Sequence, residues 1–104
     1  MYNDCKIINP TNKHIFTFIM LHPMFCDSSY FDDFLYNFKK YSNHYDNIKF
    51  IFPNSPTMDI DYPNNKQYNV KSWYNYYTCY DNIDKIDEIN LHDFSNGTKR
   101  IQKI

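Results

Sequence analysis

The longest apolar run of the chain is I-F-T-F-I-M-L, which occupies residues 15–21 and leads into a His-Pro-Met turn. Thr17 is its one polar residue. Such a run predicts a strand buried on both faces, as in the centre of a parallel sheet. A second apolar run occupies residues 48–52 and is stopped by Pro53. The pattern therefore predicts two strands, the first of them central.

Between these two runs the apolar residues recur at three- and four-residue steps, which predicts a helix from about residue 29 to residue 41. Ser28, Ser29 and Asp32 supply a helix start. Strand, helix and strand together form a parallel crossover unit, right-handed by default. Loops at the carboxyl ends of such strands are where open α/β sheets place their sites. Residues 22–27 and the residues from Pro53 onward lie at that edge.

The flanking segments complete the predicted order of elements. Residues 5–8 form a short edge strand, and an N-P-T-N turn makes a hairpin with the central strand. Residues 54–71 contain three prolines and little periodicity, so we expect a long loop. The aromatic residues 73–80 predict a short strand or a packed loop, and residues 81–88 an exposed acidic segment. A final helix is expected over residues 93–104, capped by Asp93 or Ser95.

Three motifs carry a family resemblance. L-H-P-M-F-C-D at 21–27 resembles the L-H-G-x-x-x-D segment of the phospholipase/carboxylesterase family of α/β-hydrolases, which includes acyl-protein thioesterases. F-I-F-P-N-S-P at 50–56 resembles the second strand of that family with its P-x-x-P exit, and S-W-Y at 72–74 resembles its S-W-[FY] element. The resemblance implies the amino-terminal part of an α/β-hydrolase sheet, and residues 1–104 as a single partial domain.

The same resemblance implies an activity and its site residues. The family hydrolyses carboxylic esters or thioesters through a Ser-His-Asp triad, without a cofactor. His22, Pro23 and Met24 would form the oxyanion-hole loop, with the backbone N–H of Met24 as donor. Pro23 stands where the family has glycine, and proline has no N–H and a fixed φ. Trp73 and Tyr74 are candidates for an acyl pocket.

The nucleophile elbow of this fold is missing. Gly97 is the only glycine, so no G-x-S-x-G sequence exists in these 104 residues. D-F-S-N-G at 93–97 loosely resembles an elbow around Ser95, but Asp93 replaces the small first residue. We interpret residues 90–104 instead as the helix that precedes the elbow strand. The catalytic serine, acid and base would then all lie beyond residue 104, and the chain alone is expected to be inactive.

The net charge and the cysteine and histidine content bear on which partners, which compartment and which metal sites we expect. The net charge of −1 gives no electrostatic reason to expect nucleic acid or an anionic membrane surface as partner. Three cysteines without paired spacing predict reduced thiols in the cytoplasm, and no run is long enough to span a membrane. The four histidines are scattered, so no metal site is expected.

Two alternatives to a truncated hydrolase stay open. One is a non-catalytic module of the same fold that binds acyl groups or a protein. The other is an unrelated structural or nucleic-acid-associated domain, against which the near-neutral charge argues. A complementing chain that supplies the rest of the sheet is a further candidate partner, and nothing in the sequence identifies it.

Overall fold

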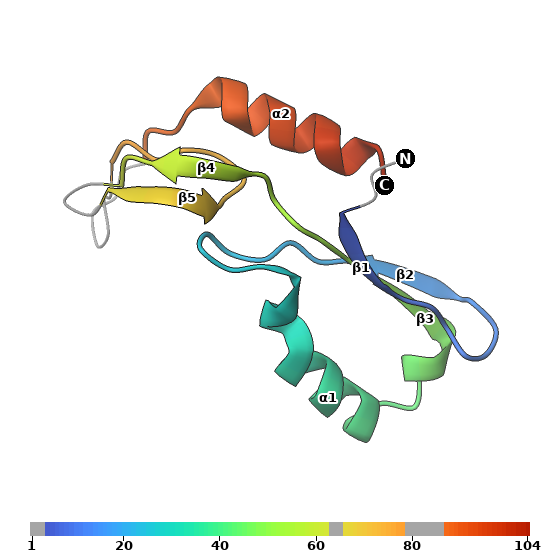
Figure 1. Ribbon diagram of the computed structural model, residues 1–104. Helices are drawn as coiled ribbons and strands as arrows, with labels where there is room; N and C mark the ends of the chain where they lie inside the picture. Colours follow the sequence, from blue (N-terminus) through green and yellow to red (C-terminus); the bar gives the residue numbers. More distant parts are fainter. Residues whose placement is uncertain (1–3, 63–65, 79–86) are drawn as a thin grey trace. The chain divides into compact units, whose positions relative to one another are not determined.

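The computed structural model describes residues 4–62, 66–78 and 87–104. The chain divides into two compact units at the boundary between Asn54 and Ser55. We call residues 4–54 the amino-terminal unit and the described part of residues 55–104 the carboxy-terminal unit. Figure 1 labels the elements of both, and each unit is described by itself below.

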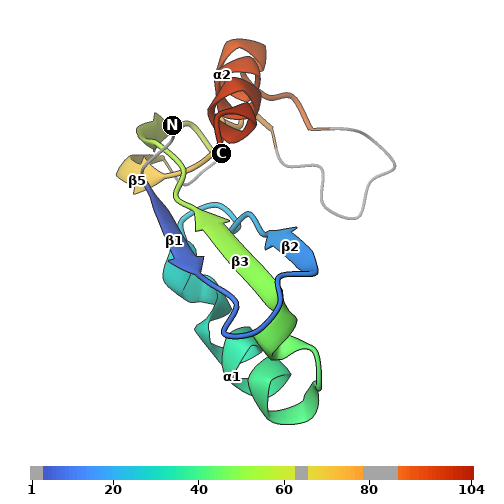
Figure 2. The ribbon, with the colours of Figure 1, turned by 90° about the vertical axis from the view of Figure 1, so that its right-hand side faces the viewer.

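The amino-terminal unit is a three-stranded sheet with one α-helix. Its elements in chain order are β1 (Cys5–Ile8), β2 (Phe16–Ile19), the 3-10 helix η1 (Ser28–Phe31), α1 (Asp32–Tyr41), the 3-10 helix η2 (Tyr45–Asn47) and β3 (Ile48–Pro53). The strand order is β1-β3-β2, with β1 antiparallel and β2 parallel to β3. Figure 2 shows β3 between the two edge strands, with α1 against one face.

This order corrects two predictions. The central strand is β3 and not the run at residues 15–21, because β3 pairs on both sides and five of its six residues are buried. All four residues of β2 are exposed instead. β1 is an edge strand as predicted, but it forms no hairpin with β2, since β3 lies between them. An apolar run reveals a strand, whereas its place in the sheet depends on which partner each edge finds.

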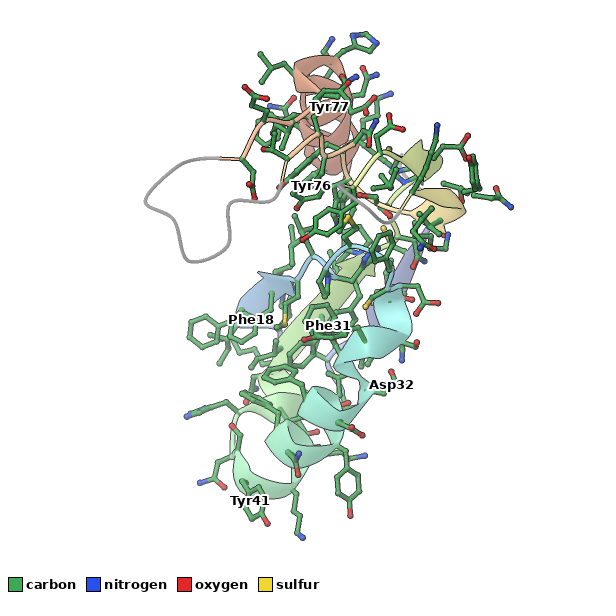
Figure 3. The ribbon with its side chains drawn as sticks, turned by 90° about the vertical axis from the view of Figure 1, so that its left-hand side faces the viewer. Phe18, Phe31, Asp32, Tyr41, Tyr76 and Tyr77 are labelled. Carbon is green, nitrogen blue, oxygen red and sulfur yellow. The ribbon has the colours of Figure 1, made fainter. Side chains whose placement is uncertain are left out.

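The core of the amino-terminal unit is a set of aromatic rings around Phe50, which is fully buried. The Phe50 ring meets Phe18 of β2 at 5.6 Å and Phe38 of α1 at 5.7 Å, both edge to face. Phe31 stacks on Phe52 at 5.2 Å between ring centroids. Figure 3 shows the side chains of Phe18 and Phe31, and Tyr41 at the far end of α1. One face of α1 therefore covers one face of the sheet.

Charges favour α1 as a helix. Asp32 and Asp33 lie in its first turn and Lys39 and Lys40 in its last turn, where each sign complements the helix dipole. Its buried residue is Leu35, on the same face as Phe38.

The carboxy-terminal unit contains a two-stranded antiparallel sheet and a helix, in the order β4 (Thr57–Ile60), β5 (Gln67–Lys71) and α2 (Leu91–Gln102). The prediction of a long loop over residues 54–71 is therefore wrong. The strands were missed because they are short and polar, and because Asn69 adopts a left-handed φ of 56° that interrupts alternation. Asparagine tolerates this conformation better than most residues. Tyr76 and Ile89 form an isolated bridge.

The final helix begins earlier than predicted. α2 starts at Leu91, and the side chain of Asn90 caps it by accepting a hydrogen bond of 2.9 Å from the Asp93 N–H. Ser95 lies inside the helix rather than at its start. The acidic segment predicted at residues 81–88 falls largely outside the described residues, as does Cys79.

Candidate functional site

The predicted oxyanion loop follows β2 directly. Pro23 and Met24 lie in a tight turn in which the Cys26 N–H donates to the carbonyl oxygen of Pro23 at 3.2 Å, and His22 immediately precedes this turn. Phe25, inside this turn, has a φ of 69°. A left-handed φ normally favours glycine, so a phenylalanine here adopts a sparsely populated conformation. The surrounding structure therefore holds Phe25 in a backbone conformation that phenylalanine rarely adopts.

His22 is the most buried residue of the loop, with 2% of its surface exposed. Its Nδ1 lies 2.8 Å from the carbonyl oxygen of Pro23. Because a carbonyl can only accept, Nδ1 carries the proton in this hydrogen bond. The imidazole thus braces the backbone on the amino-terminal side of Met24.

The amide of Met24 has no acceptor among the residues that the structure describes. Met24 is half-buried. A backbone N–H in a turn at the carboxyl edge of parallel strands is the type of group that stabilises a developing oxyanion in acyl transfer.

Asn54 ties the loop to the rest of its unit, a role that the sequence analysis missed. It follows β3, and its Oδ1 accepts from the Ser28 N–H at 2.9 Å. Its Nδ2 donates to Oδ1 of Asp4 at 3.0 Å, and its N–H donates to the Asp4 carbonyl oxygen at 2.9 Å. Asp27, which immediately precedes η1, caps that helix by accepting a hydrogen bond from the Ser29 N–H. The sequence feature that could have indicated this role is the position of Asn54 at the end of a predicted strand.

We expect Asn54→Ala to lower the free energy of unfolding by about 1–3 kcal/mol, because it leaves the Ser28 amide and the Asp4 carboxylate without these partners. Urea denaturation followed by circular dichroism measures this. The control is Asn37→Ala on the exposed face of α1, expected to change stability by less than about 0.5 kcal/mol. Equal effects of the two changes would show that Asn54 does not anchor the loop.

The S-W-Y element lies in the carboxy-terminal unit and is held by Ser72, which is buried. The Ser72 N–H donates to the carbonyl oxygen of Pro56 at 3.1 Å, and its hydroxyl donates to the carbonyl oxygen of Tyr74 at 2.8 Å. The Tyr74 ring packs against Tyr76 at 4.9 Å and Phe94 of α2 at 5.7 Å. Burial, together with the hydrogen bond to Tyr74, raises the pKa of Tyr76, so its hydroxyl stays protonated.

A cavity of about 580 Å³ lies in this unit between β4 and α2. Its lining residues are Pro56, Thr57, Met58, Asp93, Asn96, Lys99, Arg100 and Lys103. Trp73 and Tyr74 do not line it, and their role in an acyl pocket stays a prediction. The cavity carries three basic side chains and one acidic one, which suits a polar ligand better than an acyl chain.

Ser95 is an exposed residue of α2 with helix on both sides of it. A nucleophile elbow needs a sharp turn from a strand into a helix. Ser95 does not lie at such a turn. Among the described residues no three histidine, cysteine, aspartate or glutamate side chains lie close enough together to hold a metal ion. Cys5 and Cys26 are not joined in a disulfide bond.

The fold of this chain is similar to that of solved protein structures. The crystal structure of Zea mays acyl-protein thioesterase 2 matches 98% of this chain with a TM-score of 0.69 and 14% sequence identity. The fold resembles part of a thioesterase α/β-hydrolase. This chain spans 39% of the maize protein's length. No protein-family model and no curated protein sequence matches.

The likeness is therefore one of fold. It agrees with the family resemblance of the three sequence motifs at the level of architecture, and a sequence identity of 14% transfers no residue roles. In the described part of the chain, no helix is long and apolar enough to cross a bilayer.

Proposed function

We propose that this chain is the amino-terminal portion of a serine-dependent carboxylic-ester or thioester hydrolase, and that it is inactive by itself. Its contribution is the oxyanion-hole loop at His22, Pro23 and Met24. The observation that carries the proposal is the turn after β2, at the carboxyl edge of a parallel strand pair, in which the half-buried Met24 has an amide with no acceptor among the described residues.

The chemistry needs only this backbone group from the loop. In acyl transfer the carbonyl oxygen of the substrate becomes negatively charged, and a fixed N–H directed at it lowers the barrier. Removing one such donor typically costs a factor of about 10²–10³ in kcat. The hydrogen bonds of His22 to Pro23 and of Asn54 to Ser28 lie before and after Met24 in the loop, and they support a donor that is fixed before a substrate arrives.

The rest of the catalytic machinery is absent from these residues. With Gly97 as the only glycine, the chain has no G-x-S-x-G elbow, and Ser95 lies within α2. An oxyanion donor without a nucleophile and a base does not complete a turnover. The substrate class, carboxylic esters or thioesters, is thus a proposal for the whole enzyme and not for this chain.

A serine-directed fluorophosphonate probe tests the catalytic half of the proposal. We expect no covalent adduct on the purified 104-residue chain, measured by intact mass, and no hydrolysis of an octanoyl thioester above the buffer rate. The Ser95→Ala variant is the matched control. Labelling that disappears in this variant would mean that the chain carries its own nucleophile, and the proposal would be wrong.

The gene supplies a positive test of the assignment to an amino-terminal portion. The nucleotides after the Ile104 codon, read in all three frames, are expected to encode G-x-S-x-G followed by an aspartate and then a histidine. If no frame encodes these residues, the result favours the alternative proposal, in which the chain is a non-catalytic binding module of the same fold. That module predicts a change in Trp73 fluorescence when octanoate is added, because Trp73 is half-buried and sensitive to its surroundings.

A further inference from the structure

The cavity between β4 and α2 is the feature of the carboxy-terminal unit that the proposed chemistry does not use. We propose that this cavity binds a small organic phosphate monoester, with the phosphate group at the end that carries Lys99, Arg100 and Lys103. All of the lining residues belong to the carboxy-terminal unit, so the site is contained within that unit. Ester hydrolysis plays no part in this binding.

The basic side chains of the cavity come from one face of α2. Asn96, Arg100 and Lys103 follow one another at steps of four and three residues, and Lys99 lies four residues before Lys103. Residues at these steps are neighbours on a helix surface. Figure 1 shows α2 running alongside β4, whose first residues line the opposite side of the cavity. The last two turns of α2 therefore gather three cations at one end of the cavity.

Asp93, the acidic residue of the lining, does not neutralise these cations. Its carboxylate accepts a hydrogen bond of 3.1 Å from the Asn75 N–H. At a rise of about 1.5 Å per residue, Asp93 lies about 10 Å along the helix from Arg100 and about 15 Å from Lys103. Within the ranges that the structure describes, the ammonium groups of Lys99 and Lys103 form no ion pair. Their charge can therefore bind an anion.

The helix dipole accounts for only part of this positive charge. Basic residues near the carboxyl end of a helix complement about half an elementary charge. Lys99, Arg100 and Lys103, together with Asp93, give the lining a net charge of +2 (3 − 1). A phosphate monoester carries about −1.5 to −2 at pH 7, whereas a carboxylate carries a single negative charge. Charge complementarity therefore favours the phosphate monoester.

The size and the walls of the cavity indicate an organic ligand rather than an inorganic ion. Its volume of about 580 Å³ lies within the range of small-molecule sites, about 300–1,000 Å³. Pro56 and Met58 are half-buried and supply apolar surface on the β4 side. Arg100 is also half-buried, and its planar guanidinium group can donate two parallel hydrogen bonds to a phosphate group. We expect the phosphate at Arg100 and the organic group against Met58.

Phenyl phosphate is the probe for this site. Titrated into the isotope-labelled 104-residue chain, it is expected to bind with a Kd of about 1 mM or below. The backbone amide signals of Thr57, Met58, Asn96 and Arg100 are expected to shift in proportion to occupancy. Inorganic phosphate lacks the organic group and benzoate lacks the second negative charge, so each is expected to bind at least about tenfold more weakly.

Three variants make the test specific. Arg100→Gln is expected to weaken the binding of phenyl phosphate by about tenfold or more, because it removes charge-assisted hydrogen bonds. Lys103→Gln changes an exposed residue of the lining and is expected to weaken binding by about threefold to tenfold. Lys13→Gln removes the same charge from an exposed residue outside the lining and is expected to leave the affinity unchanged.

Each outcome either supports or overturns the proposal. Circular dichroism checks that the variants are folded, and Lys103→Gln decides the test if Arg100→Gln is not. Absence of phenyl phosphate binding, or shifts confined to residues outside the cavity, would overturn the proposal. Equal affinity for inorganic phosphate would mean an adventitious ion only, and equal affinity for benzoate or equal losses in Lys103→Gln and Lys13→Gln would show that charge matching is wrong. No readout involves catalysis, so failure here leaves the fluorophosphonate result unaffected.

Discussion

Phe50→Ala is expected to lower the free energy of unfolding of the amino-terminal unit by about 3–5 kcal/mol. Phe50 is fully buried in the central strand, and its ring contacts rings from β2, α1 and the η2 segment. Truncation removes this apolar area and leaves a cavity among rings that cannot all collapse into it. Urea denaturation monitored by far-ultraviolet circular dichroism measures the loss.

The matched control is Tyr41→Ala at the exposed end of α1. Tyr41 is 76% exposed, so its removal is expected to change stability by less than about 0.5 kcal/mol. If Phe50→Ala does not fold at all, Phe50→Leu retains most of the volume and is expected to lose about 1 kcal/mol. Equal stabilities for the Phe50 and Tyr41 variants would mean that the aromatic core is not formed as described.

Gly97→Val is expected to destabilise the carboxy-terminal unit by about 1–3 kcal/mol. Gly97 is buried within α2, and a Cβ added there would lie 3.3 Å from the backbone oxygen of Trp73. At an ordinary helix position, replacing glycine by alanine stabilises the helix by about 1 kcal/mol. The branched side chain of valine instead presses on a backbone atom, which moves only if the Trp73 segment shifts. The emission spectrum of Trp73 and thermal unfolding report this shift.

Ser95→Val is the control for this substitution, since it introduces the same branched side chain at an exposed position of the same helix. We expect a change within about 0.5 kcal/mol and unaltered Trp73 emission. Should Gly97→Val match Ser95→Val in both readouts, the close approach of α2 to the S-W-Y element would be contradicted. The expected difference between the two variants would instead support packing against Trp73, and not a turn, as the reason for glycine at this position.

The helices were the part of the fold that the sequence predicted best. Three- and four-residue spacing of Phe34, Leu35 and Phe38 reflects one face of α1 and does not depend on distant residues. The strand at residues 48–52 was recognised for the same local reason. Strand order was not recoverable, because the run at residues 15–21 is as apolar as a central strand although β2 pairs on one side only within the described residues.

A turn at the candidate site was predicted from the sequence, and the role of this turn in an oxyanion hole stays a prediction. The turn after β2 follows from a strand that ends in His-Pro, and the structure brings His22, Pro23 and Met24 together there. The anchoring role of Asn54 depends on contacts with Asp4 and Ser28, which lie 50 and 26 residues away in sequence. No local pattern encodes pairs at that separation. The β4 and β5 strands were missed because polar short strands carry little alternation.

The arrangement of the sheet tests the account most directly, since the position of the proposed oxyanion loop after β2 depends on it. Nuclear Overhauser contacts between backbone protons of the 104-residue chain measure it. We predict contacts between Phe18 and Phe50 in a parallel register and between Ile7 and Ile51 in an antiparallel one. Contacts between β1 and β2 in a simple hairpin, with β3 outside them, would contradict the account.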